Sequence, residues 1–350
     1  MTENQLLAAA REGDEAAFVR LVEPHRGGLY IHCYRMLGSP HDAEDALQEA
    51  LLRAWRGLAR FQGRSSLKSW LYTIATNASL RAIERRPQRV LPIDVGPAAD
   101  PHDDLPAPLA EASWVLPLPD AATPEATYEQ RESVELAFIA ALQLLPARQR
   151  AVLILREVLG FSGDEVAEAL DTTPASVYSA LQRAHRTVDE RLPAQSQQST
   201  LRTLGDAGLR AVVDGYVDAW ERGDVTALAA MLTDDATFAM PPHATWFHGR
   251  DAIASFLARV PMQGGRGWPA APTWANGQLA FAHWRLEEDG GASPHSVSVL
   301  TLRGERIEAI TAFLIPALVD RFGVTPPTSR APARHRAAPR APTGPRSRSA

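Results

Sequence analysis

The residues with the clearest capacity for chemistry are nine basic side chains between positions 53 and 89. Only one acid, Glu84, opposes them, and Trp70, Leu71 and Tyr72 lie in the middle of the stretch. The basic residues are Arg53, Arg56, Arg60, Arg64, Lys68, Arg81, Arg85, Arg86 and Arg89. Cationic side chains neutralise phosphates, and aromatic rings stack on unpaired bases. The combination predicts a surface that binds nucleic acid and holds bases outside a duplex.

An acidic helix is predicted directly before this basic stretch. The segment DAEDALQEALLRAW, residues 42–55, places acids and apolar residues on opposite sides of a helix. The acids are Asp42, Glu44, Asp45 and Glu49, and the apolar residues are Ala46, Leu47, Ala50 and Leu51. Trp55 and Phe61 are interpreted as core residues that pack the helix down. On its own, the pattern also fits a solvated acidic face that has no partner.

Composition divides the whole chain into five parts. Apolar residues recur at helical spacing in residues 4–90 and 129–192, which predicts two all-α domains. Between them, the acidic linker 91–128 contains eight prolines and no Lys or Arg, so it is expected to be extended or disordered on its own. Residues 208–322 open with helical patterns and close on alternating runs typical of strands. Residues 323–350 form a basic tail that is expected to be disordered.

One segment of the linker is too apolar for a simple spacer. SWVLPLPD, residues 113–120, contains Trp114, Val115, Leu116 and Leu118. Apolar side chains in an otherwise acidic segment indicate a docking motif, because burial would remove their surface from water. Its partner is either another protein or the C-terminal domain.

Residues 145–188 fit a helix-turn-helix. GDEVAEAL forms the first helix, DTT forms the turn, and Thr172 or Thr173 caps a second helix with Pro174 at its first position. Asp171 takes the turn position where glycine is usual, since Asp tolerates the left-handed conformation better than most residues. The predicted shared core contains Val166, Leu170, Val177 and Leu181. The residues expected to face a major groove are Thr173, Pro174, Ser176, Ser179, Gln182 and Arg183.

The stretch from Asp42 to Asn77 resembles the first conserved domain of the extracytoplasmic-function sigma factors, the promoter-recognition subunits of bacterial RNA polymerase. In that family, the helix matching DAEDALQEALLRAW docks on the β′ clamp helices of core polymerase. The polymerase contacts implied by position are Asp45, Gln48, Glu49 and Arg53. The next helix, SSLKSWLYTIATNASLRAIERR, resembles the element that melts the promoter and reads its minus-ten sequence. The DNA contacts implied there are Lys68, Asn77, Arg81 and Arg85.

The two aromatic residues of that helix have different expected roles. Trp70 and Tyr72 are two residues apart, so they cannot both face the core. Melting requires capture of bases as they leave the stack, and stacking supplies ~1–3 kcal/mol per base. For Trp70, a core position and a stacking position both remain open.

The helix-turn-helix strengthens the resemblance, because it follows the first domain at the distance where sigma factors place their minus-thirty-five reader. The resemblance implies a contact with the β flap of polymerase, and a linker that threads the polymerase cleft. This chain departs from the family at Tyr178, Ala180 and His185, where many relatives carry Lys or Arg. Fewer phosphate contacts predict weaker and less salt-sensitive binding to the minus-thirty-five element.

The segment from Gly208, with its characteristic opening YVDAWERGDVTALAAMLTDDATF, resembles the SnoaL-like superfamily, relatives of nuclear transport factor two and ketosteroid isomerase. The implied fold is a cone-shaped α+β barrel around an apolar cavity. The candidate lining residues are Tyr216, Trp220, Phe238, Met240, Trp246, Trp284 and Phe313. The whole fold class is therefore multi-domain: two all-α sigma domains, the second a helix-turn-helix, followed by an α+β SnoaL-like barrel.

Enzymatic relatives of that superfamily use an Asp or His in the cavity as a general base. The candidates here are Asp235, His243, His248 and His283. Catalysis also needs an electrophilic partner and a closed pocket. Because fold does not determine function, the expected role is regulatory and not enzymatic.

Several other classes of function are disfavoured by the sequence. The lone cysteine, Cys33, excludes an internal disulfide and is expected in the core, and no spacing typical of a metal or cofactor site is visible. The N-terminus lacks the pattern of a signal peptide, and no apolar stretch is long enough to span a membrane, so a cytoplasmic protein is expected.

The predicted function is that of an alternative sigma factor, with core polymerase and promoter DNA as partners. The C-terminal domain is expected to act as a built-in regulator that contacts the sigma domains or binds a small hydrophobic ligand. One alternative is a bifunctional protein whose C-terminal domain is an enzyme or a small-molecule sensor. Another is a DNA-binding repressor or activator that does not engage polymerase.

Overall fold

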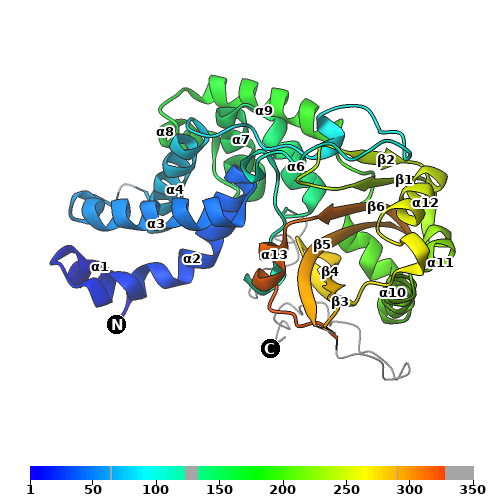
Figure 1. The fold of residues 1–350 in the computed structure, drawn as a ribbon. Helices are drawn as coiled ribbons and strands as arrows, with labels where there is room; N and C mark the ends of the chain where they lie inside the picture. The colour runs from blue at the N-terminus through cyan, green and yellow to red at the C-terminus, as the bar shows by residue number, and fades with distance from the viewer. Residues whose placement is uncertain (64, 123–132, 290, 328–350) are drawn as a thin grey trace. The chain divides into compact units, whose positions relative to one another are not determined.

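The computed structural model describes residues 1–63, 65–122, 133–289 and 291–327 (Figure 1). The chain divides into two compact units. The first contains residues 1–89 and 137–192, and the second contains residues 90–136 and the chain from 193 onward. The linker therefore groups with the C-terminal domain. Most of the predicted basic tail, from residue 328, lies outside the described residues.

The N-terminal part of the first unit is all helical. Its helices are α1 (Glu3–Arg11), α2 (Glu15–Leu37), α3 (Pro40–Gly57) and α4 (Leu67–Ile83), with a 3-10 turn, η1 (Leu58–Arg60), after α3. Asp14, Ser39 and Ser66 cap α2, α3 and α4 by accepting hydrogen bonds from backbone N–H groups of the first turn. Gly38 ends α2 at φ 67°, a left-handed conformation that glycine adopts without strain. Polar caps thus fix where each helix starts.

The second part of the first unit contains the predicted helix-turn-helix. Its helices are α6 (Leu136–Leu144), α7 (Ala147–Leu153), a π-helical turn η5 (Ile154–Val158), α8 (Gly163–Ala169) and α9 (Pro174–Asp189). Asp171 has φ 49°, as expected for the turn, and Thr173 caps α9 by accepting from the Ser176 N–H at 3.2 Å. The shared core is buried as predicted at Val177, while Leu181 is only half-buried.

The second unit is built on one six-stranded sheet with the order β2-β1-β6-β5-β4-β3. The strands are β1 (Leu232–Ala239), β2 (Trp246–His248), β3 (Ala270–Ala275), β4 (Gln278–Leu286), β5 (Ala292–Arg303) and β6 (Arg306–Phe313). β1 and β6 are parallel, and every other pair is antiparallel. Among the described strands, β2 and β3 do not pair with each other, so the cone is an open sheet and not a closed barrel.

The sheet is accompanied by helices α10 (Gln197–Arg222), α11 (Val225–Ala230), α12 (Arg250–Arg259) and α13 (Pro316–Arg321) (Figure 1). Gly205 interrupts α10 at φ 64° and ψ 179°. Tyr216 and Trp220 of α10 pack on the same sheet face as Phe281 and His283. The ring centroids of Tyr216 and Phe281 are 4.2 Å apart, and those of Trp220 and His283 are 4.8 Å apart.

The opposite face of the sheet carries Trp284 and Phe313. Successive strand residues point to opposite faces, and their neighbours His283 and Ala312 belong to the α10 side. Both aromatic side chains are nevertheless fully buried, so this face is covered as well. The structure therefore does not place these two predicted cavity residues on the sheet face that meets Tyr216.

The linker is an ordered part of the second unit over residues 90–122. It runs extended, with 3-10 turns at η2 (Pro92–Asp94), η3 (Glu111–Ser113) and η4 (Asp120–Ala122). Near its start, the Ala99 N–H donates to the Trp246 carbonyl of β2 at 2.9 Å. Near its end, Leu118 and Asn276 exchange two hydrogen bonds, of 2.8 and 2.9 Å. The segment therefore reaches both edges of the sheet.

SWVLPLPD is the most deeply seated part of this linker. Trp114 and Val115 are 0% exposed and Leu118 is 1% exposed, and Pro119 forms an isolated β-bridge with Ala275 of β3. The interpretation of SWVLPLPD as a docking motif is confirmed, and the C-terminal domain is its partner.

Candidate nucleic-acid and polymerase interface

The acidic side of α3 divides into an exposed part and a buried part. Asp45, Gln48 and Glu49 are exposed, as the predicted polymerase contacts must be. Asp42 is only 4% exposed, because its carboxylate forms ion pairs with Arg86 and Arg89. Asp42 therefore stabilises the domain and does not contribute to a solvated acidic face.

The same ion pairs reduce the basic surface that the sequence predicts. The Arg89 guanidinium lies 2.6 Å from the Asp42 carboxylate and is almost fully buried. Arg86 is partly exposed, and its pKa is lowered by burial and by the charge of Arg89 beside it. Arg86 and Arg89, at the C-terminal end of the basic stretch, therefore face the acidic helix α3.

A pocket of about 320 Å³ lies between the end of α3 and α4. Its lining residues are Arg53, Gly57, Arg60, Phe61, Trp70, Ile74, Asn77 and Arg81. The lining includes three arginines and no acid, and the Phe61 and Trp70 ring centroids are 4.9 Å apart at 33° between ring planes. Positive charge beside a pair of tilted aromatic rings suits an unpaired base with its phosphate.

The pocket gathers some predicted DNA contacts and omits others. Asn77 and Arg81 line it, while Lys68 and Arg85 are exposed outside its lining. Arg53, a predicted polymerase contact, also lines it and pairs with Glu49. Arg60, which the sequence places in the basic stretch but not among the individual DNA contacts, also lines the pocket, one residue before Phe61.

The structure separates the roles of the two aromatic residues of α4. Tyr72 is buried and meets His32 edge-on, with ring centroids 5.3 Å apart. Trp70 is half-buried and lines the pocket beside Phe61. The prediction that both cannot face the core is confirmed.

The helix α9 presents its predicted recognition residues to solvent. The exposed residues are Thr173, Pro174, Ser176, Ser179, Gln182 and Arg183. Tyr178 is also 54% exposed on this helix, and its hydroxyl lies near Gly163 of α8. Since Arg183 and Arg186 are the arginines of α9, its positive charge is modest, as the sequence predicts.

The predicted cavity residues of the C-terminal domain do not form one set. Tyr216, Trp220, Phe238 and Met240 belong to a single buried cluster. Trp246 lies on the edge strand β2, where its Nε1–H donates to the Gly96 carbonyl of the linker at 2.8 Å. Trp246 therefore anchors the linker and does not line an apolar interior. The other two, Trp284 and Phe313, lie on the opposite face of the sheet.

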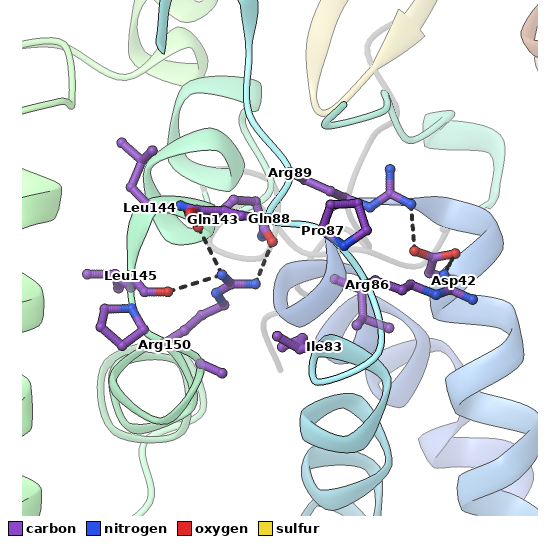
Figure 2. Close-up of a pocket in the computed structure, with 13 residues that line it drawn as sticks. Asp42, Ile83, Arg86, Pro87, Gln88, Arg89, Gln143, Leu144, Leu145 and Arg150 are labelled. Atoms are coloured by element: carbon purple, nitrogen blue, oxygen red, sulfur yellow. Dashed lines mark hydrogen bonds and ion pairs between the residues drawn. The ribbon is translucent and has the colours of Figure 1, made fainter. Parts of the chain in front are cut away.

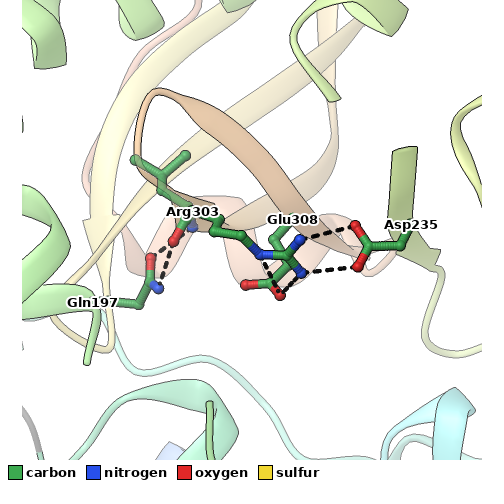
Figure 3. A network of polar contacts seen from close by, with 5 residues as sticks. Gln197, Asp235, Arg303 and Glu308 are labelled. Atoms are coloured by element: carbon green, nitrogen blue, oxygen red, sulfur yellow. Dashed lines mark hydrogen bonds and ion pairs between the residues drawn. The ribbon is translucent and has the colours of Figure 1, made fainter. Parts of the chain in front are cut away.

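The candidate general bases are scattered in the same way. Asp235 is exposed and accepts two hydrogen bonds of 3.0 Å from Arg303, which also pairs with Glu308 (Figure 3). These bonds lower the pKa of Asp235 to about 2, so it is a weak base. His248 is exposed, and the Nδ1 of His243 lies 2.8 Å from the Pro106 carbonyl of the linker.

His283 is the one candidate base inside the buried cluster. It is 2% exposed, and neither ring nitrogen has a hydrogen-bond partner within the described chain. Burial lowers its pKa to about 3, so the imidazole is neutral near pH 7. A neutral, unpaired imidazole in an apolar site offers one donor and one acceptor.

Cysteine and metal chemistry have little support in the described residues. Cys33 is 0% exposed, and burial raises the pKa of its thiol to about 12. Within residues 1–327, leaving aside the gaps at 64, 123–132 and 290, no cluster of three His, Cys, Asp or Glu side chains is placed to hold a metal. In that same part of the chain, no helix is both long and apolar enough to cross a bilayer.

An exposed acidic helix, a cationic aromatic pocket and a helix-turn-helix on one chain define a promoter-recognition subunit. Comparison with known families agrees. The chain matches Sigma-70 region 2 over residues 21–88, Sigma-70 region 4 over 135–188 and the SnoaL-like domain over 213–310.

Individual relatives extend the match along the chain. The ECF RNA polymerase sigma factor SigG of Mycobacterium tuberculosis is 40% identical over 323 residues, which are 91% of this chain and 85% of that protein. SigW of Bacillus subtilis is 29% identical over 185 residues, which are 52% of this chain and 92% of that protein. The crystal structure of M. tuberculosis SigJ shares the fold at a TM-score of 0.57 and 22% identity, over 85% of this chain and 97% of SigJ.

The chain belongs to the extracytoplasmic-function RNA polymerase sigma factors. It is an alternative sigma factor for promoter-specific transcription initiation, and it carries a fused C-terminal SnoaL-like domain.

Proposed function

We propose that α3 and α9 divide the work of this sigma factor. The exposed side chains of Asp45, Gln48 and Glu49 contact the β′ clamp helices of core polymerase in the cytoplasm. The helix-turn-helix domain contacts the β flap and places α9 in the major groove of the minus-thirty-five element. Exposure of both sets of side chains on separate helices supports this assignment.

The pocket beside Trp70 captures a base of the melted minus-ten element. The pair Phe61–Trp70 supplies an aromatic surface, Asn77 can hydrogen-bond a base edge, and Arg60 and Arg81 neutralise the phosphates on either side. Capture after melting lowers the free energy of the open complex, because the extruded base leaves water and stacks on an aromatic side chain.

The SnoaL-like domain acts as a built-in regulator by holding the linker between the two sigma domains. The observation that carries this proposal is the attachment of the linker to the C-terminal domain, through two hydrogen bonds between Leu118 and Asn276 of 2.8 and 2.9 Å and a β-bridge between Pro119 and Ala275. A linker fixed in this way is unavailable to polymerase, so binding of polymerase and docking of the linker compete.

The test is in vitro transcription with the full chain and its Asn276→Gly variant. Asn276 has φ 57°, so glycine keeps the turn while the side-chain bonds to Leu118 and Val134 are lost. A changed level of initiation supports regulation through the linker. Thr203→Ala, on an exposed part of α10, is the control, and equal transcription from all three proteins contradicts the proposal.

A second candidate role, small-molecule sensing by the C-terminal domain, is favoured by His283. An unpaired donor and acceptor in an apolar cluster are costly unless a polar ligand or water satisfies them. The check is a thermal-shift screen of small hydrophobic alcohols and ketones. A compound that raises the melting temperature of the wild-type protein but not of His283→Phe supports the sensor role. If no compound raises the melting temperature of either protein, the result counts against it.

A further inference from the structure

Arg150 of α7 lies between the C-terminal ends of two helices from different sigma domains. Its side chain is buried, and it donates to the carbonyls of Gln143 at 3.0 Å and Leu145 at 3.1 Å, at the end of α6. It also donates to the Met36 carbonyl, at the end of α2 in the first sigma domain. Helix C-termini leave carbonyls unpaired and carry partial negative charge, so a guanidinium is well suited to this place.

Gln143 forms the second half of the same junction. Its Nε2 donates to the Arg35 carbonyl of α2 at 3.0 Å, and its Oε1 accepts from Arg150. Its own carbonyl also accepts from Gln88 of the first sigma domain at 3.0 Å. The fit is close, because a Cβ on Gly38 would lie 3.0 Å from the Gln143 side chain.

The junction is polar and incompletely packed. A pocket of about 340 Å³ opens beside these bonds, between the end of α4 and the α6–α7 corner (Figure 2). Voids forfeit dispersion contacts, so the hydrogen bonds of Arg150 and Gln143 supply a larger share of the cohesion. Other contacts also cross the junction, among them the Tyr72 and Phe161 rings at 5.9 Å and Ser69 with Glu165 at 3.5 Å.

The closed junction is incompatible with simultaneous reading of two promoter elements. Elements centred near minus ten and minus thirty-five are about 25 base pairs apart, or roughly 85 Å at ~3.4 Å per base pair. A compact unit of this length has a radius of gyration of about 15 Å. The two sigma domains must therefore separate before both elements can be engaged.

We propose that Arg150 and Gln143 form a latch that holds the two sigma domains together and opens when core polymerase binds. The bonds to Met36, Arg35 and Gln88 break on opening. The bonds of Arg150 to Leu145 and Gln143 remain, because they lie within one domain. The helix-turn-helix domain therefore keeps its fold while its partner moves away.

The experiment measures the distance between spin labels on the full chain, at Val19→Cys in α2 and Arg186→Cys in α9. Both positions are exposed, at 57% for Val19 and 86% for the Arg186 side chain. The buried Cys33, with its raised pKa, does not compete for the label. The expected result is a short distance in the free protein and a long one in the holoenzyme.

The variant Gln143→Ala removes the cross-domain bond to Arg35. It is expected to add a long-distance population to the free protein and to tighten binding to core polymerase several-fold, which simple destabilisation would not do. The matched control is Arg148→Gln on the next helix, α7. Arg148 donates to Leu170 within its own domain, so neither readout should change.

Gln88→Ala is the second variant, because Gln88 is exposed and its loss spares the buried network. Compared with Gln143→Ala, this variant is expected to give a smaller increase in the long-distance population and in the affinity for core polymerase. The latch is overturned if the holoenzyme keeps the short distance, or if folded Gln143→Ala and Gln88→Ala both match the wild-type distance and affinity.

Discussion

The Asp42 carboxylate lies 2.6 Å from the Arg89 guanidinium inside the first sigma domain, and both side chains are nearly inaccessible to water. The pair joins the start of α3 to the chain just beyond α4. It therefore connects α3, the helix that we propose contacts polymerase, to the end of α4, the helix that we propose contacts DNA.

Asp42→Asn is expected to destabilise the first unit by about 3–5 kcal/mol, because it removes the buried carboxylate that pairs with the buried Arg89. Urea unfolding followed by circular dichroism measures the change. Asp45→Asn is the control, since the Asp45 carboxylate is exposed and lies 3.7 Å from Arg86. That variant should change stability by less than about 1 kcal/mol.

Trp70→Ala is expected to weaken binding of the holoenzyme to single-stranded minus-ten DNA by roughly 10-fold, in line with the loss of ~1–3 kcal/mol of stacking. Permanganate reactivity of promoter thymines would show fewer open complexes. Binding to duplex minus-thirty-five DNA serves as the control and should be retained. An equal loss on both DNAs would indicate misfolding and not a stacking role.

Arg183→Gln is expected to weaken binding to minus-thirty-five duplex and to reduce the dependence of log K on log salt by about 1, the signature of one lost phosphate contact. Fluorescence anisotropy at several salt concentrations measures the slope. Glu190→Gln, at the end of the same helix, should leave the slope unchanged. An unaltered slope in Arg183→Gln would place that side chain away from the phosphates.

The buried histidines predict that stability is lost as pH falls. Burial lowers the pKa of His283 to about 3, while the unfolded chain titrates near 6.5. The unfolded state therefore binds more protons between those values, and the free energy of unfolding decreases as pH falls through that window. At pH 5 the loss is roughly 2 kcal/mol for one histidine.

Calorimetry at pH 7 and pH 5 tests this for the C-terminal unit. His283→Phe should remove most of the pH dependence of that unit. His32, whose pKa is also lowered to about 3 by burial, provides an internal control in the first unit, which should remain acid-sensitive. If the C-terminal unit of His283→Phe still loses stability between pH 7 and pH 5, titratable groups other than His283 cause that loss.

The helix-turn-helix shows what sequence alone can predict. Its turn and cap are local, so Asp171 and Thr173 specify them regardless of the rest of the chain. The Asp42–Arg89 pair could not be foreseen, because the two residues are 47 positions apart and an acid on a helix is usually solvated.

The C-terminal sheet shows a different limit. Successive side chains of a strand point to opposite faces, so the sequence places Trp284 and His283 on different faces of the sheet. It does not predict which of these faces packs against α10, because both faces are buried. The apolar character of SWVLPLPD predicted docking, whereas its partner depended on three-dimensional proximity to Asn276 and Ala275.

The path of the linker has one further consequence, which concerns self-association. An open sheet has two edges whose unpaired N–H and C=O groups invite pairing with another chain. The linker covers part of each, through Ala99 at β2 and Pro119 at β3. Lifting the linker to free it for polymerase would bare both edges at once. Transcriptional activity and colloidal stability then oppose each other, and prolonged activation would make this protein prone to aggregation.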